Sequence, residues 1–124
     1  MIMLDTHIAV ALYEGRTAGL SPKTKRELDQ GTASISPAVA FEIEMLHEIG
    51  RLGPNAATIV KSIAQDLSIR IASDPFASVV SEAVGLSFTR DPFDRLIVAH
   101  AALLKSPLIT FDDHVRRHYQ RATN

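Results

Sequence analysis

The chain of 124 residues contains no cysteine, which excludes a disulfide framework, a thiolate metal site and a cysteine nucleophile. It also lacks an apolar stretch long enough to cross a bilayer, and it does not begin with the basic and long apolar segments of a secretion signal. We therefore expect a cytoplasmic protein with no membrane partner. The formal net charge of -1 excludes the overall positive charge that is typical of many nucleic-acid-binding proteins.

The residues that are present suit one folded domain. The hydrophobic fraction is 46%, which is typical of a globular chain and not of a disordered segment. No internal repeat, low-complexity tract or linker divides the sequence. We therefore expect a single domain that covers residues 1–124.

Short apolar runs alternate with helical patterns along the chain. Strands are expected at residues 1–4, 32–35, 67–72 and 108–110. Helices are expected at residues 6–14, from 22 onward, and at 37–50, 55–66, 74–87 and 91–105. Alternation of this kind predicts an α/β fold in which a parallel sheet has helices on both faces.

Four acidic side chains lie at strand ends, at a helix start or within an apolar helix stripe: Asp5, Glu42, Asp94 and Asp112. Asp5 directly follows the strand expected at residues 1–4, and Asp112 closely follows the one expected at 108–110. In proteins with parallel sheets, ligands bind at the carboxyl ends of the strands. Carboxylates near a core are costly unless a positive charge holds them. Their convergence indicates a divalent cation, and a cation held by carboxylates indicates phosphodiester chemistry.

Asp5 and Asp112 each have a structural alternative. Asp5 could cap the helix that begins near Thr6, but Thr6 is itself a good cap and would leave the Asp5 carboxylate free. Asp112 could simply form a turn. Thr110 precedes Asp112 by two residues, and we expect its hydroxyl to support a metal-bound water or a neighbouring carboxylate.

Glu42 and Asp94 have more specific positions. Glu42 falls within the apolar stripe formed by Val39, Ile43, Leu46 and Ile49. Its alternative role is a glutamate at the edge of the stripe that reaches water. Glu44 falls on the opposite, polar side and is expected to be solvated. At the start of the later helix we assign Asp91 to capping and Asp94 to the site.

The segments 4–7 (LDTH), 36–43 (SPAVAFEI), 91–101 (DPFDRLIVAHA) and 108–112 (LITFD) resemble, in this order, the PIN domain. More narrowly, they resemble the VapC-like toxins of type II toxin–antitoxin pairs. The resemblance implies a three-layer α/β/α fold with a parallel sheet of four or five short strands. Residues 120–124 are a poor match to the fifth strand, and the basic tail could instead extend a helix after Asp112.

The resemblance also implies a function. Asp5, Glu42, Asp94 and Asp112 would bind Mg²⁺ or Mn²⁺, and a metal-activated water would cleave RNA. A homodimer and a cognate antitoxin protein are the implied partners. Thr6 and Thr110 would support the site.

Two further hypotheses concern basic residues. Arg116 and Arg117, in a basic cluster that follows the last site acid, would contact the RNA backbone. Arg95 would pair with a site carboxylate. Among the histidines, His100 lies in an apolar helix and is expected to be a hydrogen-bonded core residue rather than a ligand.

Other functions require residues that the chain lacks. A phosphatase of the haloacid dehalogenase type needs a second Asp two residues after the first, where this chain has His7. A receiver domain needs paired acids after the first strand and a Lys after the last, and neither is evident. The alternative is a catalytically inactive PIN-fold module that binds RNA or protein, which metal-dependent RNA cleavage would exclude.

Overall fold

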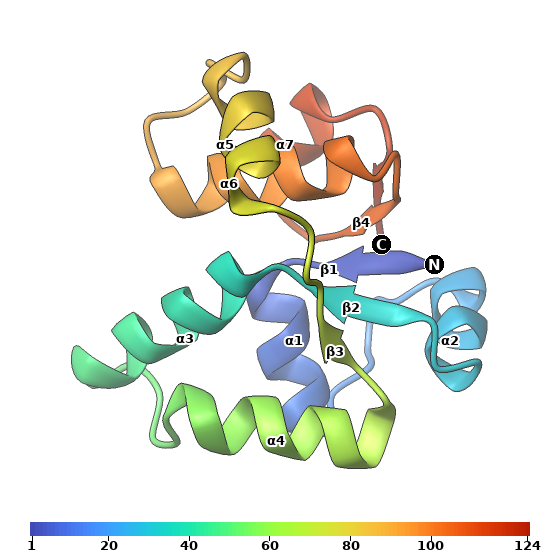
Figure 1. The fold of residues 1–124 in the computed structure, drawn as a ribbon. Helices are drawn as coiled ribbons and strands as arrows, with labels where there is room; N and C mark the ends of the chain where they lie inside the picture. Colours follow the sequence, from blue (N-terminus) through green and yellow to red (C-terminus); the bar gives the residue numbers. More distant parts are fainter.

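The computed structural model describes residues 1–124, and its strands form one parallel sheet (Figure 1). The strands are β1 (Ile2–Leu4), β2 (Ala33–Ile35), β3 (Arg70–Ile71), β4 (Leu108–Ile109) and β5 (Ala122–Thr123). Their spatial order is β3-β2-β1-β4-β5. The first strand therefore lies at the centre, with the carboxyl ends of β2 and β4 on either side of its own.

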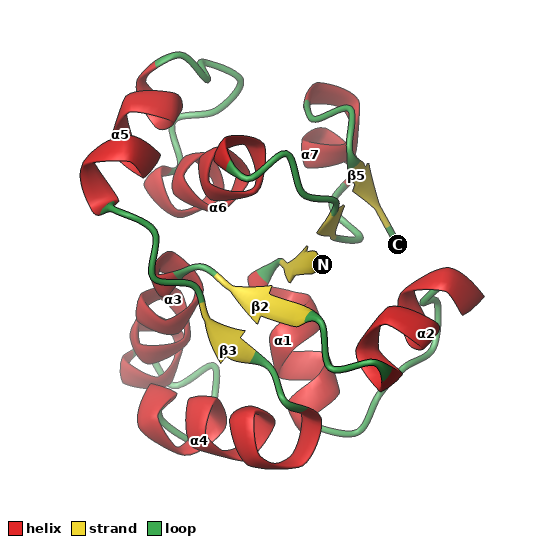
Figure 2. Cartoon of the chain, turned by 45° about the vertical axis from the view of Figure 1, so that its right-hand side comes forward, coloured by secondary structure: helices red, strands yellow, loops and turns green.

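The helices are α1 (Thr6–Tyr13), α2 (Pro22–Asp29), α3 (Pro37–Glu48), α4 (Ala56–Leu67), α5 (Phe76–Val84), α6 (Pro92–Leu103) and α7 (Asp113–His118). Helices α1 and α4 cover one face of the sheet, and α5, α6 and α7 lie on the other side (Figures 1 and 2). Helix α3 packs against α1, α4 and α6. The predicted three-layer α/β/α fold is confirmed. No helix combines the length and apolar character needed to cross a membrane.

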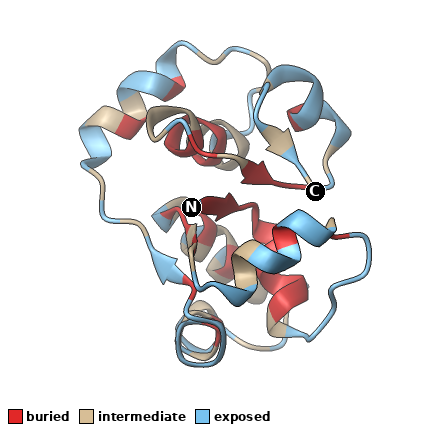
Figure 3. Cartoon of the chain, turned by 90° about the vertical axis from the view of Figure 1, so that its right-hand side faces the viewer, coloured by how far each residue is buried: buried red, intermediate tan, exposed pale blue.

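The buried core lies in the central strands and on the helix faces that turn toward them (Figure 3). Apolar side chains with no exposed surface come from strands and helices alike: Ile35, Val39, Ile43, Ile59 and Leu108. In this core, Leu4 of β1 pairs in register with Ile109 of β4. The residues that follow these two strands are therefore held side by side.

Local capping signals place several helix starts where the sequence predicts them. Ser21 and Asp91 are N-caps whose side chains accept backbone N–H bonds, and each is followed by a proline at the first helical position. The Asp91 carboxylate accepts the N–H groups of both Phe93 and Asp94. This capping fixes the first turn of α6, which carries Asp94.

At the end of the chain, where the match to a fifth strand is poor, the structure has both a short helix and a short edge strand. A short helix does form after Asp112, but residues 122–123 then pair with β4 as a fifth strand. Two residues give almost no strand signal in a sequence. Tertiary bonds hold this strand instead, since the Tyr119 hydroxyl donates to the Ser106 carbonyl at 2.6 Å and the Ser21 N–H donates to the Asn124 carbonyl at 2.8 Å.

The strand expected at 67–72 is shorter than predicted. Helix α4 continues to Leu67 and ends at Ser68, whose φ of 57° lies in the left-handed region. Only Arg70 and Ile71 then join the sheet. The segment 67–72 therefore divides between a helix end and an edge strand, which periodicity alone does not separate.

Candidate active site

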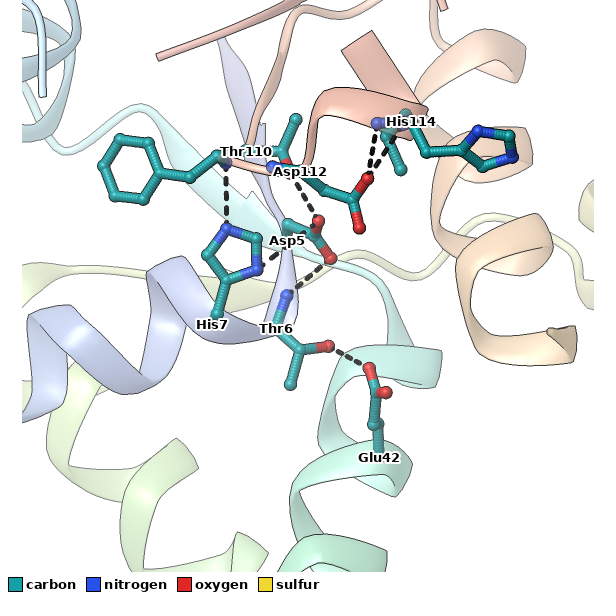
Figure 4. A network of polar contacts seen from close by, with 9 residues as sticks. Asp5, Thr6, His7, Glu42, Thr110, Asp112 and His114 are labelled. Atoms are coloured by element: carbon teal, nitrogen blue, oxygen red, sulfur yellow. Dashed lines mark hydrogen bonds and ion pairs between the residues drawn. The ribbon is translucent and has the colours of Figure 1, made fainter. Parts of the chain in front are cut away.

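All four predicted site acids line one cavity of about 260 Å³ at the carboxyl edge of the sheet. Asp5 follows β1, and Asp112 lies three residues after the end of β4. Glu42 comes from α3 and Asp94 from the first turn of α6. Figure 4 shows Asp5, Glu42 and Asp112 around the start of α1. The structure thus brings together residues that are far apart in the sequence, while their catalytic role stays a prediction.

Asp5 is held by two hydrogen bonds. Its side chain is the N-cap of α1, with Oδ1 accepting the Thr6 N–H at 2.8 Å. Its other oxygen, Oδ2, accepts the Thr110 hydroxyl at 2.7 Å. The expectation that Thr6 would be the cap and leave Asp5 free was wrong, because α1 begins at Thr6 itself. The residue is only 6% exposed, so its carboxylate has a fixed orientation.

Thr6 instead connects α1 with α3, since its hydroxyl donates to Glu42 Oε1 at 2.5 Å (Figure 4). Burial raises the pKa of Glu42 above the ordinary 4.5. The bond from Thr6 opposes this rise, and the charges of Asp5 and Asp91 add to it. Glu42 is therefore a partly desolvated carboxylate within a negative environment.

Asp94 shows the strongest effect of the shared negative charge. Burial, together with repulsion from Asp91, Asp5, Glu42 and Asp112, raises its pKa to about 7. The carboxylates of the other three site acids thus all act on this one group. A bound cation would relieve that repulsion and favour the ionised form.

Asp112 caps helix α7, whereas the structural alternative expected from the sequence was a turn. Its Oδ1 accepts the N–H groups of His114 at 2.8 Å and Val115 at 3.0 Å, at the start of α7. Its own N–H donates to the Thr110 hydroxyl oxygen at 3.0 Å. Both capping bonds use Oδ1, so Oδ2 is not engaged by them. Thr110 supports Asp5 and Asp112 together, as expected of a residue that supports neighbouring carboxylates.

His7 also lines the cavity, with a ring orientation set by the backbone. Its Nε2 accepts the Phe111 N–H at 2.9 Å, so the neutral ring carries its proton on Nδ1. That Nδ1 lies 3.7 Å from Asp5 Oδ2. Because Nε2 accepts a backbone N–H and Nδ1 carries the proton, neither ring nitrogen of His7 is free to bind a metal in this arrangement.

The hypothesis that Arg95 pairs with a site carboxylate was wrong. Its guanidinium donates to the carbonyl of Ala83 at 2.8 Å, at the end of α5, and reaches the Thr89 carbonyl at 3.5 Å. Successive residues of a helix point about 100° apart. Arg95 therefore faces α5 while Asp94 faces the cavity.

The predicted contact of Arg116 and Arg117 with RNA stays a prediction. Arg116 and Arg117 are exposed in the last turn of α7 and are not among the residues that line the cavity. Arg16 and Arg51 do line it, although the sequence did not single them out for this role. Both follow helix ends, where periodicity gives no signal about the direction of a side chain.

Two residues outside the cavity, His100 and Glu44, were also predicted from the sequence, and only the first prediction is confirmed. His100 is 1% exposed, and its ring nitrogens contact Ser36 Oγ at 3.0 Å and Asp74 Oδ2 at 2.9 Å. This confirms a hydrogen-bonded core histidine. Glu44 was expected to be solvated, but its Oε1 accepts the Ala56 N–H at 3.0 Å, because the next helix begins directly beside it.

The donor chemistry of the cavity fits a divalent cation. It offers carboxylate oxygens, which Mg²⁺ prefers, and a bound cation would oppose both the burial and the carboxylate repulsion that raise the pKa of Asp94. No three His, Asp or Glu side chains form a ready-made cluster for a metal ion. The absence of such a cluster is compatible with Mg²⁺, which usually retains several waters and uses only one or two carboxylates plus substrate oxygens.

The raised pKa of Asp94 predicts how stability depends on pH. Between about pH 4 and pH 7 the folded chain retains a proton on Asp94 that the unfolded chain has released, so the free energy of unfolding falls as pH rises. Asp94→Asn should weaken this fall and raise the melting temperature at pH 8 by several degrees, as measured by circular dichroism in EDTA. Asp113→Asn, on the exposed side of α7, is the control. Equal pH slopes for wild type and Asp94→Asn would refute the shared negative field.

Comparisons with known proteins identify the family and the fold of this chain. The family model of the PIN domain matches residues 2–120. A chain in the crystal structure of VapBC2 from Rickettsia felis, bound to a DNA fragment from their promoter, has a TM-score of 0.72 and 19% identity, covering 100% of this chain and 98% of that one. A chain in a toxin–antitoxin complex from Klebsiella pneumoniae has a TM-score of 0.68 and 19% identity, covering 100% and 97%.

No curated protein matches the sequence. At 19% identity the structural matches show a shared fold. The family model, in contrast, spans nearly the whole chain, including all four acids that line the cavity. This chain therefore belongs to the PIN-domain family.

Proposed function

We propose that the protein is a Mg²⁺- or Mn²⁺-dependent endoribonuclease that acts as the toxin of a toxin–antitoxin pair. The observation that carries the proposal is the single cavity lined by Asp5, Glu42, Asp94 and Asp112. PIN domains are generally nucleases, which supports phosphodiester cleavage. The likeness in fold to chains of toxin–antitoxin complexes supports the biological role.

The chain itself would supply binding and orientation. When bound, a divalent cation supplies Lewis acidity, which lowers the pKa of a water and withdraws charge from a phosphate. The four acids would hold the cation either directly or through its bound waters, since Mg²⁺ retains several waters and takes only one or two carboxylates as direct ligands. Thr110 fixes Asp5 Oδ2, and Thr6 fixes Glu42 Oε1, so that these carboxylates need little reorganisation. No covalent protein nucleophile is required.

Arg116 and Arg117 are proposed to contact the RNA backbone beyond the cavity. They are exposed on the helix that Asp112 caps, which places positive charge near one of the site acids. Exposed arginines bind phosphates without reading sequence. Alanine at both positions should weaken RNA binding in low salt, and unchanged binding would remove them from the interface.

A homodimer and an antitoxin partner are also proposed. Large apolar side chains are exposed on α3 and α5, including Phe41 at 60% and Phe76 at 69%. Both residues line an apolar cavity of about 380 Å³. Contiguous apolar surface of this kind is typical of protein interfaces. Sedimentation of the purified chain as a monomer at micromolar concentration would contradict the homodimer.

The enzyme proposal is tested by incubating the purified protein with total RNA, with Mg²⁺ or with EDTA, and then mapping the cut ends. We expect defined cuts that appear only when the cation is present. The alternative function, an inactive PIN-fold module, predicts binding without new RNA ends. Cleavage that is equally fast in EDTA would contradict the metal-dependent mechanism.

A further inference from the structure

The active-site cavity has a basic part as well as an acidic part. Arg16 and Arg51 line it together with the four acids. Neither guanidinium forms an ion pair with any of the four acids. The two arginines are therefore separated from the acids by more than ion-pair distance.

Helices α1 and α3, which pack against each other, explain this separation. The N-terminal end of α1 is capped by Asp5, and Arg16 follows its C-terminal end. Helix α3 carries Glu42 and ends at Glu48, before Arg51. The rise of α3 between Glu42 and its last residue is about 9 Å. Both arginines thus follow the far ends of helices whose earlier residues supply the acids.

The chain fixes the backbone of Arg51 against the cavity. Two residues after the end of α3, Gly50 has a left-handed φ of 80°, which turns the chain away from the helix. The N–H of Arg51 then donates to the Leu46 carbonyl at 2.9 Å, and the N–H of Leu52 donates to the same oxygen at 3.2 Å. Leu46 and Leu52 line the cavity beside Arg51. The guanidinium forms no ion pair in the structure, so its donors are available to a ligand.

Arg16 is anchored similarly but has one exposed partner. Its backbone N–H donates to the Ala11 carbonyl at 2.8 Å, beyond the end of α1. Its guanidinium donates to Glu14 Oε1 at 2.8 Å, with side chains that are 63% and 47% exposed. Such an exposed pair is weak and exchanges readily. A guanidinium has five N–H donors, so most of them remain free for an anion.

We propose that Arg16 and Arg51 form a phosphate subsite that holds a backbone phosphate next to the one at the acids. The inference rests on the proposed function, since the acids must bind a cation and a scissile phosphate. Apolar surface from Val10, Leu46 and Leu52 also lines the cavity. An RNA strand supplies matching chemistry, because its phosphates alternate with less polar sugar and base surfaces. Guanidinium groups bind phosphate by paired N–H bonds.

A peptide with an acidic residue could also reach the two arginines, but a single strand of RNA fits the surroundings better. The Phe111 ring is 40% exposed and lies 5.8 Å from the His7 ring, which borders Asp5. Exposed aromatic rings stack on unpaired bases. The acids, the arginines and an aromatic surface together match the three parts of a nucleotide chain.

The subsite is tested by the affinity of a short, labelled, single-stranded RNA for Asp5→Asn protein, measured in Mg²⁺ over a series of KCl concentrations. Into this background we introduce Arg16→Ala, Arg51→Ala, both together, and Arg51→Lys. Arg70→Ala is the matched control, because Arg70 is exposed on the edge strand β3 and does not line the cavity. Melting temperatures confirm that each variant is folded.

We expect the double variant to bind RNA at least about tenfold more weakly and to reduce the salt slope by about 0.7, which corresponds to one lost phosphate contact. Arg51→Lys should largely retain the slope, and Arg70→Ala should match the parent protein. In protein that contains Asp5, the double variant should raise KM more than it lowers kcat.

Failure of the phosphate subsite and failure of the proposed function would give different results. If wild-type protein cleaves RNA but the double variant has an unchanged slope and KM, the phosphate subsite is refuted while the proposed function stands. If wild-type protein neither binds nor cleaves RNA, the proposed function fails and the subsite with it. Loss of antitoxin binding together with unchanged RNA binding would show that the arginines hold a peptide, which also refutes the RNA subsite.

Discussion

Asp5→Asn is expected to reduce Mg²⁺-dependent RNA cleavage by at least about a hundredfold without changing the fold. Asp5 is the buried acid at the end of the central strand, held by bonds from Thr6 and Thr110. Loss of a partner that only orients a metal ligand typically costs about 10–100-fold, so loss of a ligand should cost no less. Asparagine retains an oxygen to cap α1. The rate of cleavage of a mapped RNA is the measurement.

Asp113→Asn is the matched control for this substitution. Asp113 is an exposed acid in the first turn of α7, next to Asp112, but it does not line the cavity. The Asp113→Asn protein should cleave RNA at the wild-type rate. Wild-type cleavage by Asp5→Asn would remove Asp5 from the mechanism, whereas a lowered melting temperature would assign its role to capping.

His100→Ala is expected to lower the free energy of unfolding by about 3 kcal/mol, from the cavity left by the ring and the loss of one buried and one partly buried hydrogen bond. The ring of His100 connects α6 with Ser36 at the start of α3 and with Asp74 before α5. The His100 ring is 1% exposed, whereas the Asp74 side chain is 31% exposed, so the loss of the ring costs most on the side of Ser36. Urea unfolding followed by circular dichroism measures the effect.

Two further variants show whether the loss of stability in His100→Ala comes from the buried hydrogen-bond network. Asp74→Asn retains an acceptor for the ring and should cost only about 1 kcal/mol. His118→Ala, on the exposed surface of α7, should cost less than about 1 kcal/mol. If His100→Ala unfolds at the same urea concentration as wild type, the buried network does not stabilise the junction of these helices.

Local signals explain why much of this fold can be predicted from the sequence. Ser21 and Asp91 precede prolines and cap their helices as expected, because capping depends only on neighbouring backbone groups. The stripe around Glu42 correctly identified Val39 and Ile43 as buried. Ile49, however, is 62% exposed, because α3 extends past the core before it ends.

Features that depend on tertiary geometry could not be predicted in the same way. Arg95 was assigned to the acids because of its neighbour Asp94, but its direction is set by the nearby end of α5. Arg16 and Arg51 reach the cavity only because loops after two different helices turn toward it. Asp5 proved to be the cap of α1 because the first helical residue is Thr6, a difference of one residue that sequence patterns do not resolve.

The central claim, that folding gathers four separate acids into one cation site, is tested most directly by titrating Mn²⁺ into the protein and measuring bound ion by electron paramagnetic resonance. Wild type, Asp113→Asn and single amide variants of the four acids that line the cavity are compared at pH 8. We predict one saturable site that each of the four substitutions weakens and that Asp113→Asn leaves unchanged. No saturable binding to wild type, or equal affinity in all variants, would contradict the account.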